Sequence, residues 1–335
     1  MIKRTVEISQ NAAYLTVHLD QLLIQRDRET VGRIPCEDLG VLLVDQPQVT
    51  YSHAALARLM EFDAAVVVCG RNHLPAGILL PLADHSQVVW RVQLQVDVPK
   101  PLKKQLWKQL IQAKIRGQAD NLLAGPARTR LLAIAREVRS GDPENAEGQA
   151  GRFYWPALFA RHPHPSPLPK GEGETVFRRD PDGAPPNNLL NYGYAVVRAA
   201  LARAIVAAGL LPALGLKHSN RSNAFSLADD LIEPLRPLVD ARVRTIFAGG
   251  ACELTPAVKA KLLELLSEPV ELGEQRGPLL VNLHRYVASL VRCYDGAAKQ
   301  LEIPTVAFRG KSQSELDFAP RENLPTASSP LTPTP

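Results

Sequence analysis

The stretch VPKPLKKQLWKQLI, residues 98–111, separates two parts of the chain that differ in sequence periodicity. Pro101 suits a first helical turn, and the apolar residues around and after it recur at helical spacing: Leu102, Leu106, Trp107, Leu110 and Ile111. Because short strand-like runs precede this stretch and helical stripes follow it, we predict an α+β fold. An N-terminal β-sandwich-like domain is expected over residues 1–90 and a mostly α-helical domain over residues 98–318.

The first ninety residues contain short β-branched or aliphatic runs separated by Asn, Asp, Gly and Pro, which is typical of strands joined by turns. The predicted strands are Thr5–Ile8, Tyr14–Val17, Leu22–Gln25, Thr30–Ile34, Leu39–Val44, Ala65–Cys69 and Gly77–Leu80, with one helix around Ser52–Phe62. Further helices are expected at about 125–139, 143–159, 187–208, 226–247, 254–267 and 277–300.

Two segments are rich in proline and are not assigned to helix or strand. Residues 161–186 hold seven prolines together with His162 and His164, and we interpret them as an inserted, exposed loop between two helices. The two histidines could bind a metal, but a solvated loop explains them more simply. Residues 319–335 are expected to form a disordered tail.

The composition is that of a folded, soluble protein. The chain has 335 residues, of which 45% are hydrophobic and 22% charged, and this balance excludes wholesale disorder. Its most apolar stretch, residues 194–216, is interrupted by Arg198 and Arg203, so no membrane span or membrane partner is expected. The four cysteines form no C-x-x-C pair and fit no zinc or disulfide spacing, and the N-terminal residues lack the apolar core of a secretion signal. We therefore expect a cytoplasmic protein with reduced thiols.

Positive charge is concentrated in one block. Residues 98–139 carry 10 basic and 2 acidic side chains, whereas residues 1–97 carry 8 basic and 11 acidic ones. Such a block suits a polyanion, because each neutralised phosphate releases counterions. The block includes four lysines that are candidates for DNA contacts: Lys103, Lys104, Lys108 and Lys114. The simpler alternative is the solvated face of an ordinary helix.

Two regions of the helical half could carry chemistry. In the first, Asp142 and Pro143 resemble a helix N-cap and first helical residue, with Glu147 just beyond the first turn. In the second, His218 precedes Asp230 and Glu233, which lie three residues apart on one expected helix face. Carboxylates with one imidazole suit Mg²⁺ or Mn²⁺ better than structural zinc. From spacing alone, a solvated helix carboxylate is the favoured interpretation of Glu147, and a capped surface helix after a polar loop explains most of the second region.

Several longer motifs, in order along the chain, resemble the CRISPR-associated endonuclease and integrase family Cas1, in the version that accompanies type II systems. The resemblance covers nearly the whole chain. Its strongest marks are Ser140-Gly141-Asp142-Pro143, Tyr154-Trp155-Pro156-Ala157-Leu158-Phe159, Leu190-Asn191-Tyr192-Gly193-Tyr194-Ala195 and Asn223-Ala224-Phe225-Ser226-Leu227-Ala228-Asp229-Asp230-Leu231-Ile232-Glu233-Pro234.

The resemblance implies a metal-dependent DNA nuclease and integrase. Glu147, His218 and Glu233 would be its catalytic, metal-binding residues for Mg²⁺ or Mn²⁺. Asp230 would be an auxiliary carboxylate, and Lys217 and Arg221 would stabilise phosphate charge unless they serve only solubility. The reaction implied is attack of a DNA 3′-hydroxyl on a phosphodiester at a repeat boundary, which inserts a short foreign fragment as a new spacer. The implied partners are double-stranded DNA, a second copy of the chain and a dimer of the small adaptation protein Cas2.

Two features depart from the family pattern, namely the long stretch from Arg161 to Thr175 and the proline-rich tail. The first lies between ligand-bearing helices and leaves open whether this protein is active. Two alternative functions are therefore kept beside the integrase, and only the first of them depends on this stretch. One is a DNA-binding adaptation subunit with impaired catalysis. The other is a general metal-dependent DNA repair nuclease.

Overall fold

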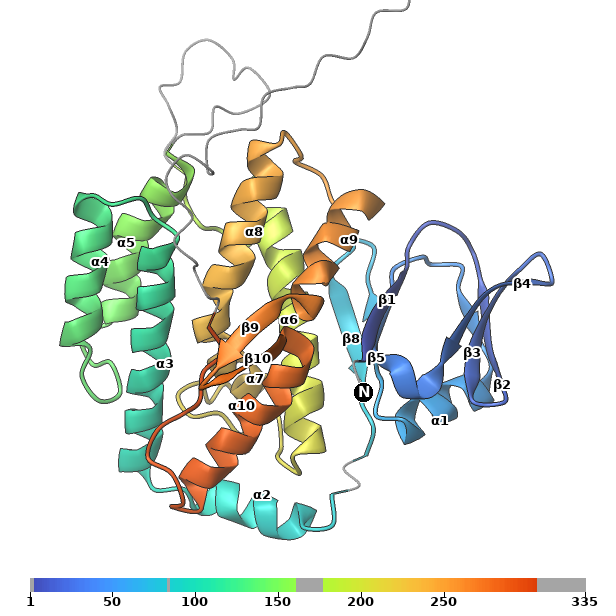
Figure 1. The fold of residues 1–335 in the computed structure, drawn as a ribbon, viewed down its shortest axis with the longest axis horizontal. Coiled ribbons are helices and arrows are strands. Elements are labelled where there is room, and N and C mark those ends of the chain that lie inside the picture. The colour runs from blue at the N-terminus through green and yellow to red at the C-terminus, as the bar shows by residue number, and fades with distance from the viewer. Residues whose placement is uncertain (1–2, 83–84, 161–176, 306–335) are drawn as a thin grey trace, which may run out of the picture.

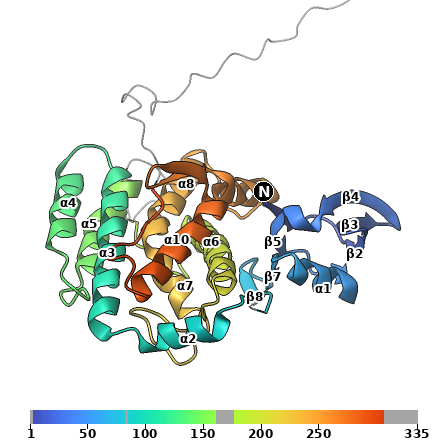
Figure 2. The ribbon, with the colours of Figure 1, turned by 60° about the horizontal axis from the view of Figure 1, so that its bottom comes forward.

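A computed structural model describes residues 3–82, 85–160 and 177–305 (Figure 1). The predicted disordered tail, residues 319–335, and most of the predicted insertion lie outside these ranges. Within them, an N-terminal β-rich part is followed by a mainly helical part, so the predicted α+β fold is confirmed. Figure 2 shows the strands standing to one side of the helices.

The predicted N-terminal strands are all present, with ends shifted by at most two residues. They are β1 (Arg4–Ile8), β2 (Tyr14–His18), β3 (Gln21–Arg26), β4 (Glu29–Pro35), β5 (Leu39–Val44), β7 (Ala65–Cys69) and β8 (Pro75–Leu79). The short η1 (Cys36–Asp38), β6 (Thr50–Tyr51) and α1 (His53–Glu61) complete this part. One sheet has the order β1-β5-β7-β8 and the other β4-β3-β2-β6.

Strand β5 is buried on both faces, which explains its unbroken apolar sequence. Leu42 and Val44 face a core that the two sheets share with α1. Val41 and Leu43 on the other face join the core of the helical part. The first sheet therefore lies between the second sheet and the helices, and it couples the two parts of the chain.

Most helices of the helical part lie where the helical spacing of apolar residues predicts them. Its helices are α2 (Val88–Asp97), α3 (Lys100–Asp120), α4 (Pro126–Glu137), α5 (Ala146–Phe159), α6 (Asn187–Ala207), α7 (Ser226–Leu231), α8 (Arg236–Ala248), α9 (Pro256–Leu263) and α10 (Leu279–Tyr294). Between them lie the 3₁₀ turns η2 (Glu233–Leu235) and η3 (Glu264–Ser267) and the hairpin β9 (Pro269–Leu272) and β10 (Gln275–Pro278).

Three predictions differ from the structure in detail. The single helix expected at 226–247 is divided into α7, η2 and α8, because Pro234 and Pro237 lack the backbone N–H that a continuous helix needs. Helix α2 was not predicted, and it spans the domain boundary expected near residue 90. Strand β10 of the hairpin β9–β10 occupies the first residues of the helix expected at 277–300.

Helix α6 is the central element of the helical part. It is long and apolar enough to cross a membrane, but 78% of its most apolar window is buried inside the protein. Gly193 lets it approach α8 closely, because a Cβ there would lie 2.5 Å from a methyl carbon of Val239. We therefore interpret α6 as the core helix of a folded domain.

The described end of the proline-rich segment, residues 177–186, is only partly exposed. Phe177 packs against Phe159 with ring centroids 4.4 Å apart. Arg179 donates hydrogen bonds to Asn187 and Asn191 on α6. The expectation of an exposed loop is therefore wrong for these residues, because an aromatic ring and a guanidinium group anchor them to the helices.

A buried ion pair joins the two parts of the chain. The Asp45 carboxylate, next to β5, accepts from the ammonium group of Lys259 on α9, and both side chains are at least 97% buried. His73 Nδ1 lies 3.0 Å from the same carboxylate. Removing one partner would leave an uncompensated buried charge.

We therefore predict that Lys259→Met lowers the free energy of unfolding by about 3–5 kcal/mol, measured by urea titration. The matched control Lys261→Met, at an exposed position of the same helix, should change it by less than about 0.5 kcal/mol. Adding Asp45→Leu to Lys259→Met should recover much of the loss, because no buried charge then remains. A Lys259→Met protein as stable as the wild type would contradict the interpretation.

Candidate functional site

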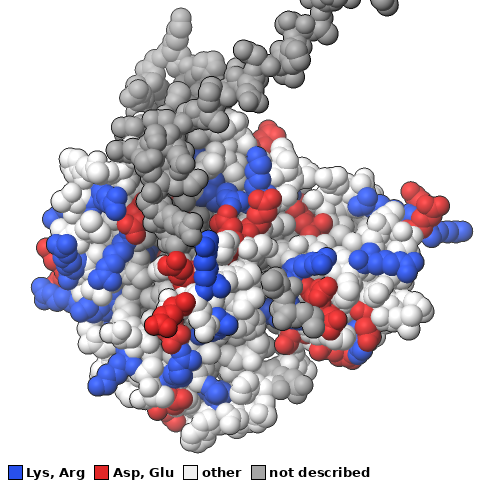
Figure 3. Space-filling view, viewed as in Figure 1, with Lys and Arg blue, Asp and Glu red and all other residues white. Residues whose placement is uncertain are grey.

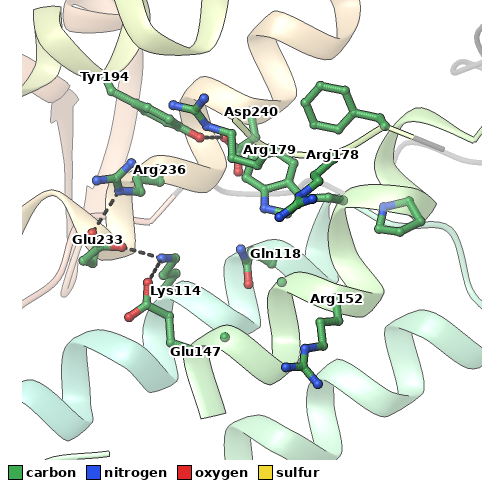
Figure 4. Close-up of a pocket in the computed structure, with 15 residues that line it drawn as sticks. Lys114, Gln118, Glu147, Arg152, Arg178, Arg179, Tyr194, Glu233, Arg236 and Asp240 are labelled. Atoms are coloured by element: carbon green, nitrogen blue, oxygen red, sulfur yellow. Dashed lines mark hydrogen bonds and ion pairs between the residues drawn. The ribbon is translucent and has the colours of Figure 1, made fainter. Parts of the chain in front are cut away.

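Three segments far apart in sequence meet around the ammonium group of Lys114 (Figure 4). Lys114 Nζ donates to Glu147 Oε1 at 2.5 Å and also to Glu233 Oε2. Arg236 Nε donates to the other oxygen of Glu233 at 3.0 Å. Helix α3, the start of α5 and the turn η2 are thereby joined through two carboxylates and two cations.

Burial strengthens these ion pairs. The side chains of Lys114 and Glu233 are only 10% and 6% exposed. Burial alone would lower the pKa of Lys114, but Glu233 and Glu147 outweigh it and raise the pKa above its usual value. Burial would likewise raise the pKa of Glu233, but Lys114 and Arg236 hold it below the usual value. The site therefore holds formal charges rather than neutral groups.

Glu147 is the second residue of α5, where the positive end of the helix dipole favours a carboxylate. The predicted helix start at Asp142 and Pro143 is wrong, because Gly141 and Asp142 both have positive φ and Asn145 is the N-cap. The Asp142 side chain still accepts hydrogen bonds from the backbone N–H groups of Ala146 and Glu147. The loop thus fixes the position of Glu147.

His218 is held by Asp230 rather than by the two glutamates. His218 Nδ1 lies 2.5 Å from Asp230 Oδ1, and Asp230 Oδ2 accepts from the backbone N–H groups of Leu216 and Lys217. This loop requires Gly215, because a Cβ there would lie 2.4 Å from the carbonyl oxygen of His218. The hydrogen bond to Asp230 raises the pKa of His218, with smaller contributions from Glu233 and Glu147.

The arrangement leaves one imidazole nitrogen for a ligand. When Nδ1–H donates to the Asp230 carboxylate, Nε2 of the neutral ring carries the free lone pair. The rings of Trp107 and His218 also pack in a T-shaped arrangement, with centroids 5.5 Å apart. Asp230 and Trp107 therefore orient His218.

The donor set of the site suits a hard divalent cation. Among the described residues, no three His, Cys, Asp or Glu side chains converge closely enough to hold a metal as they stand. The carboxylates of Glu147 and Glu233 nevertheless both contact Lys114 Nζ. The negative charges of both also contribute to raising the pKa of His218. Two carboxylate oxygens and an imidazole nitrogen match Mg²⁺ or Mn²⁺. The donor atoms of Glu147, His218 and Glu233 are thus of the kinds that such a cation binds, and the ammonium group of Lys114 lies between the two glutamates.

A pocket of about 500 Å³ opens beside the two glutamates. Five cationic side chains and three carboxyl groups line it, together with the aromatic rings of Trp155, Phe177 and Tyr194. The cations are Lys114, Arg152, Arg178, Arg179 and Arg236. The excess of positive charge favours an anionic ligand, and the rings offer surfaces for stacking.

The remaining predicted residues are placed differently. The expectation that Lys114 shares a DNA-binding surface with Lys103, Lys104 and Lys108 is wrong, because Lys114 is buried among carboxylates. Lys104 is exposed and Lys103 and Lys108 are half-buried. Lys217 Nζ donates to the carbonyl oxygen of Gly141 at 3.0 Å, so it links two loops of the site. Arg221 is exposed in the loop after His218.

Sequence reasoning missed Lys114, Arg236 and Asp240 as parts of the site. A signal for Lys114 was present, because it lies four residues after Leu110 and three after Ile111, in phase with the apolar stripe. A lysine at a buried helical position needs a buried partner. No comparable signal identifies its partners, which come from distant segments.

Comparisons with known proteins agree with this fold. A family model described as "CRISPR associated protein Cas1" matches residues 6–259. The CRISPR-associated endonuclease Cas1 of Neisseria meningitidis is 37% identical over 303 residues, covering 89% of this chain and 94% of that protein. A CRISPR-associated endonuclease Cas1 of Pyrobaculum aerophilum is 27% identical over 285 residues, covering 81% and 92%. The chain belongs to the Cas1 family.

Solved structures show the same fold at lower identity. A casposase bound to integration product has a TM-score of 0.73 at 19% identity, covering 90% of this chain and 93% of that chain. A Cas1 protein from Thermotoga maritima gives 0.69 at 16% identity, covering 88% and 97%. A Cas6-RT-Cas1–Cas2 complex gives 0.70 at 16% identity, covering 90% of this chain and 36% of that chain.

Behind the pocket, a buried network ties four helices together. Asp240 accepts hydrogen bonds from the hydroxyl groups of Tyr154, at 2.8 Å, and Tyr194. Asn121 Nδ2 donates to the Tyr154 hydroxyl oxygen at 3.0 Å. Burial raises the pKa of Asp240 from 3.8 to about 6, although both tyrosines and Arg236 oppose the shift.

This pKa predicts a pH dependence of stability. Ionising Asp240 is harder in the folded than in the unfolded protein, so its stabilising contribution is present below pH 3.8 and is lost as pH rises through about 6. The stability advantage of Asp240→Asn over the wild type should therefore grow by about 3 kcal/mol between pH 4 and 7. Urea unfolding of both proteins across this range measures the difference, and a difference independent of pH would contradict the assignment.

Proposed function

We propose that this Cas1 protein is a metal-dependent DNA endonuclease and integrase of CRISPR adaptation. It would insert short foreign DNA fragments as new spacers, through attack of a DNA 3′-hydroxyl on a phosphodiester of the repeat. One observation carries the proposal: the carboxylates of Glu147 and Glu233 converge on a single cation, Lys114, at the edge of a cationic pocket.

Each residue of the site has a distinct part in this proposal. Glu147 and Glu233 would supply oxygen ligands to Mg²⁺ or Mn²⁺, and His218 would supply Nε2. Asp230 is a positioning residue, because its carboxylate fixes the tautomer and orientation of His218. When bound, the metal supplies Lewis-acid activation of the phosphate and of the attacking oxygen.

The pocket would hold the DNA strand whose end reacts. Arg152 and Arg179 line it together with Gln118, and their positive charge suits phosphate groups. Trp155 and Phe177 would stack against bases. Arg221 remains a candidate for phosphate contact, whereas Lys217 already donates to Gly141 and would serve chiefly to hold the loop of His218.

The proposed partners follow from chemistry and from related proteins. Lysine and arginine side chains gather over the side of the helical part that carries α3 and α4 (Figure 3), which suits double-stranded DNA. A casposase of similar fold is bound to an integration product, and a Cas1 of similar fold occurs in a complex with Cas2. We extend these to a homodimer that works with a Cas2 dimer in the cytoplasm, in a type II-like system.

The two other functions receive less support. A subunit with impaired catalysis would need a defective site, but all three proposed ligands and the positioning residue Asp230 are present. The segment from Arg161 to Thr175 that raised this alternative lies outside the described residues. A general repair nuclease would use the same site, and joining as opposed to cutting of labelled DNA separates it from an integrase.

We predict that Glu147→Ala, His218→Ala and Glu233→Ala each abolish metal-dependent cleavage and integration, because each removes one of three ligands. The variants should keep the far-UV circular dichroism of the wild type. Glu144→Ala, which alters an exposed carboxylate in the adjacent loop, is the matched control and should retain full activity. Wild-type activity of Glu147→Ala would reject the site.

We also predict that Lys104→Glu combined with Lys108→Glu weakens binding to duplexes of all sequences alike. The log–log slope of affinity against salt concentration should become shallower by roughly one unit for each lost phosphate contact. The control pair Arg28→Glu and Arg33→Glu lies on the exposed β3–β4 hairpin, away from the basic block. Fluorescence anisotropy with a random-sequence duplex at several salt concentrations measures both, and equal slopes for all three proteins would contradict the prediction.

A further inference from the structure

Lys114 takes the position that a divalent ion would need. Its Nζ contacts Glu147 Oε1 and Glu233 Oε2 simultaneously, and its side chain is 90% buried. An ammonium group and a metal ion cannot both lie directly between the same two carboxylate oxygens, because they repel each other and compete for the same lone pairs. A metal that binds between Glu147 Oε1 and Glu233 Oε2 must therefore displace Lys114.

The structure also contains a place for the displaced group. Gln118 follows Lys114 by four residues, so both side chains lie on the same face of α3. Gln118 is 97% buried and lines the pocket next to Lys114. Its Oε1 has no hydrogen-bond partner among the described residues, which is costly for a buried acceptor. An ammonium group would satisfy it.

We infer that Lys114 is a built-in counter-ion that holds Glu147 and Glu233 together without metal and moves toward Gln118 Oε1 when a divalent ion binds. This inference rests on the proposed function, since it takes Glu147 and Glu233 as metal ligands. In the first position Lys114 prevents the buried carboxylate of Glu233 and the half-buried carboxylate of Glu147 from repelling each other. In the second it adds positive charge to the pocket that faces the DNA phosphates. The divalent ion must compete with Lys114, so its affinity is lower than the carboxylates alone would give.

The test is the affinity of the full chain for Mn²⁺, measured from the electron paramagnetic resonance signal of free Mn²⁺. Lys114→Met should bind Mn²⁺ about tenfold or more tightly, because the competing charge is gone. Gln118→Met should bind it up to about tenfold more weakly, because the displaced ammonium loses its acceptor. Lys100→Met, at an exposed position of the same helix, should bind it like the wild type. Loss of packing alone would not move the two variants in opposite directions.

A second measurement uses the wild type, in case Lys114→Met does not fold. An amine-reactive reagent should modify Lys114 faster when Mg²⁺ is added, because the ammonium group is released from its two carboxylates at the side of the pocket. Mass spectrometry measures this rate, with exposed Lys104 as the internal control at constant reactivity.

The outcomes separate this inference from the proposed function. Wild-type Mn²⁺ binding that is lost in Glu147→Ala, together with unchanged affinity in Lys114→Met or unchanged labelling of Lys114, would overturn the inference and leave the metal site intact. Mn²⁺ binding that persists in Glu147→Ala and Glu233→Ala, or no binding to any of these proteins, would overturn both.

Discussion

The structure depends on one constraint, which is that two glutamates brought together from distant segments require a cation between them. Glu147 comes from the start of α5 and Glu233 from the turn before α8, and both contact Lys114 on α3. Buried like charges repel strongly unless a positive group compensates them. The packing of α3, α5 and η2 therefore requires positive charge at this point, whether it comes from lysine or from a metal ion.

The surrounding architecture limits how far these groups can move. The buried carboxylate of Asp230 accepts hydrogen bonds from two backbone N–H groups and lies within hydrogen-bond distance of the imidazole of His218. These contacts hold the loop that carries the histidine in place. Asp240 and its tyrosine partners Tyr154 and Tyr194 join α5, α6 and α8 behind the pocket. A rigid frame around a cation is the arrangement that the proposed phosphodiester chemistry would need, because the charged groups would have to be in place before the DNA binds.

Much of this fold could be predicted from local pattern. The N-terminal strands follow from β-branched runs between turn residues, and the stripe of Leu106, Leu110 and Ile111 identifies α3. The local sequence pattern does not show which residues of distant segments contact each other in the fold. Lys114 belongs to a basic block by composition, yet its helical phase places it inside the protein, where only the fold reveals Glu147 and Glu233. The true start of α5 was missed because the positive φ angles of Gly141 and Asp142 extend the turn to Asn145.

In the function proposed here, Glu147, His218 and Glu233 bind one divalent ion at the position that Lys114 Nζ now takes. A crystal of the full chain grown with Mn²⁺ tests it directly, through anomalous diffraction at the manganese absorption edge. We expect one strong anomalous peak about 2.0–2.6 Å from oxygens of both glutamates and from His218 Nε2, with Lys114 moved toward Gln118. A peak elsewhere in the molecule, with Lys114 still bridging Glu147 and Glu233, would contradict it.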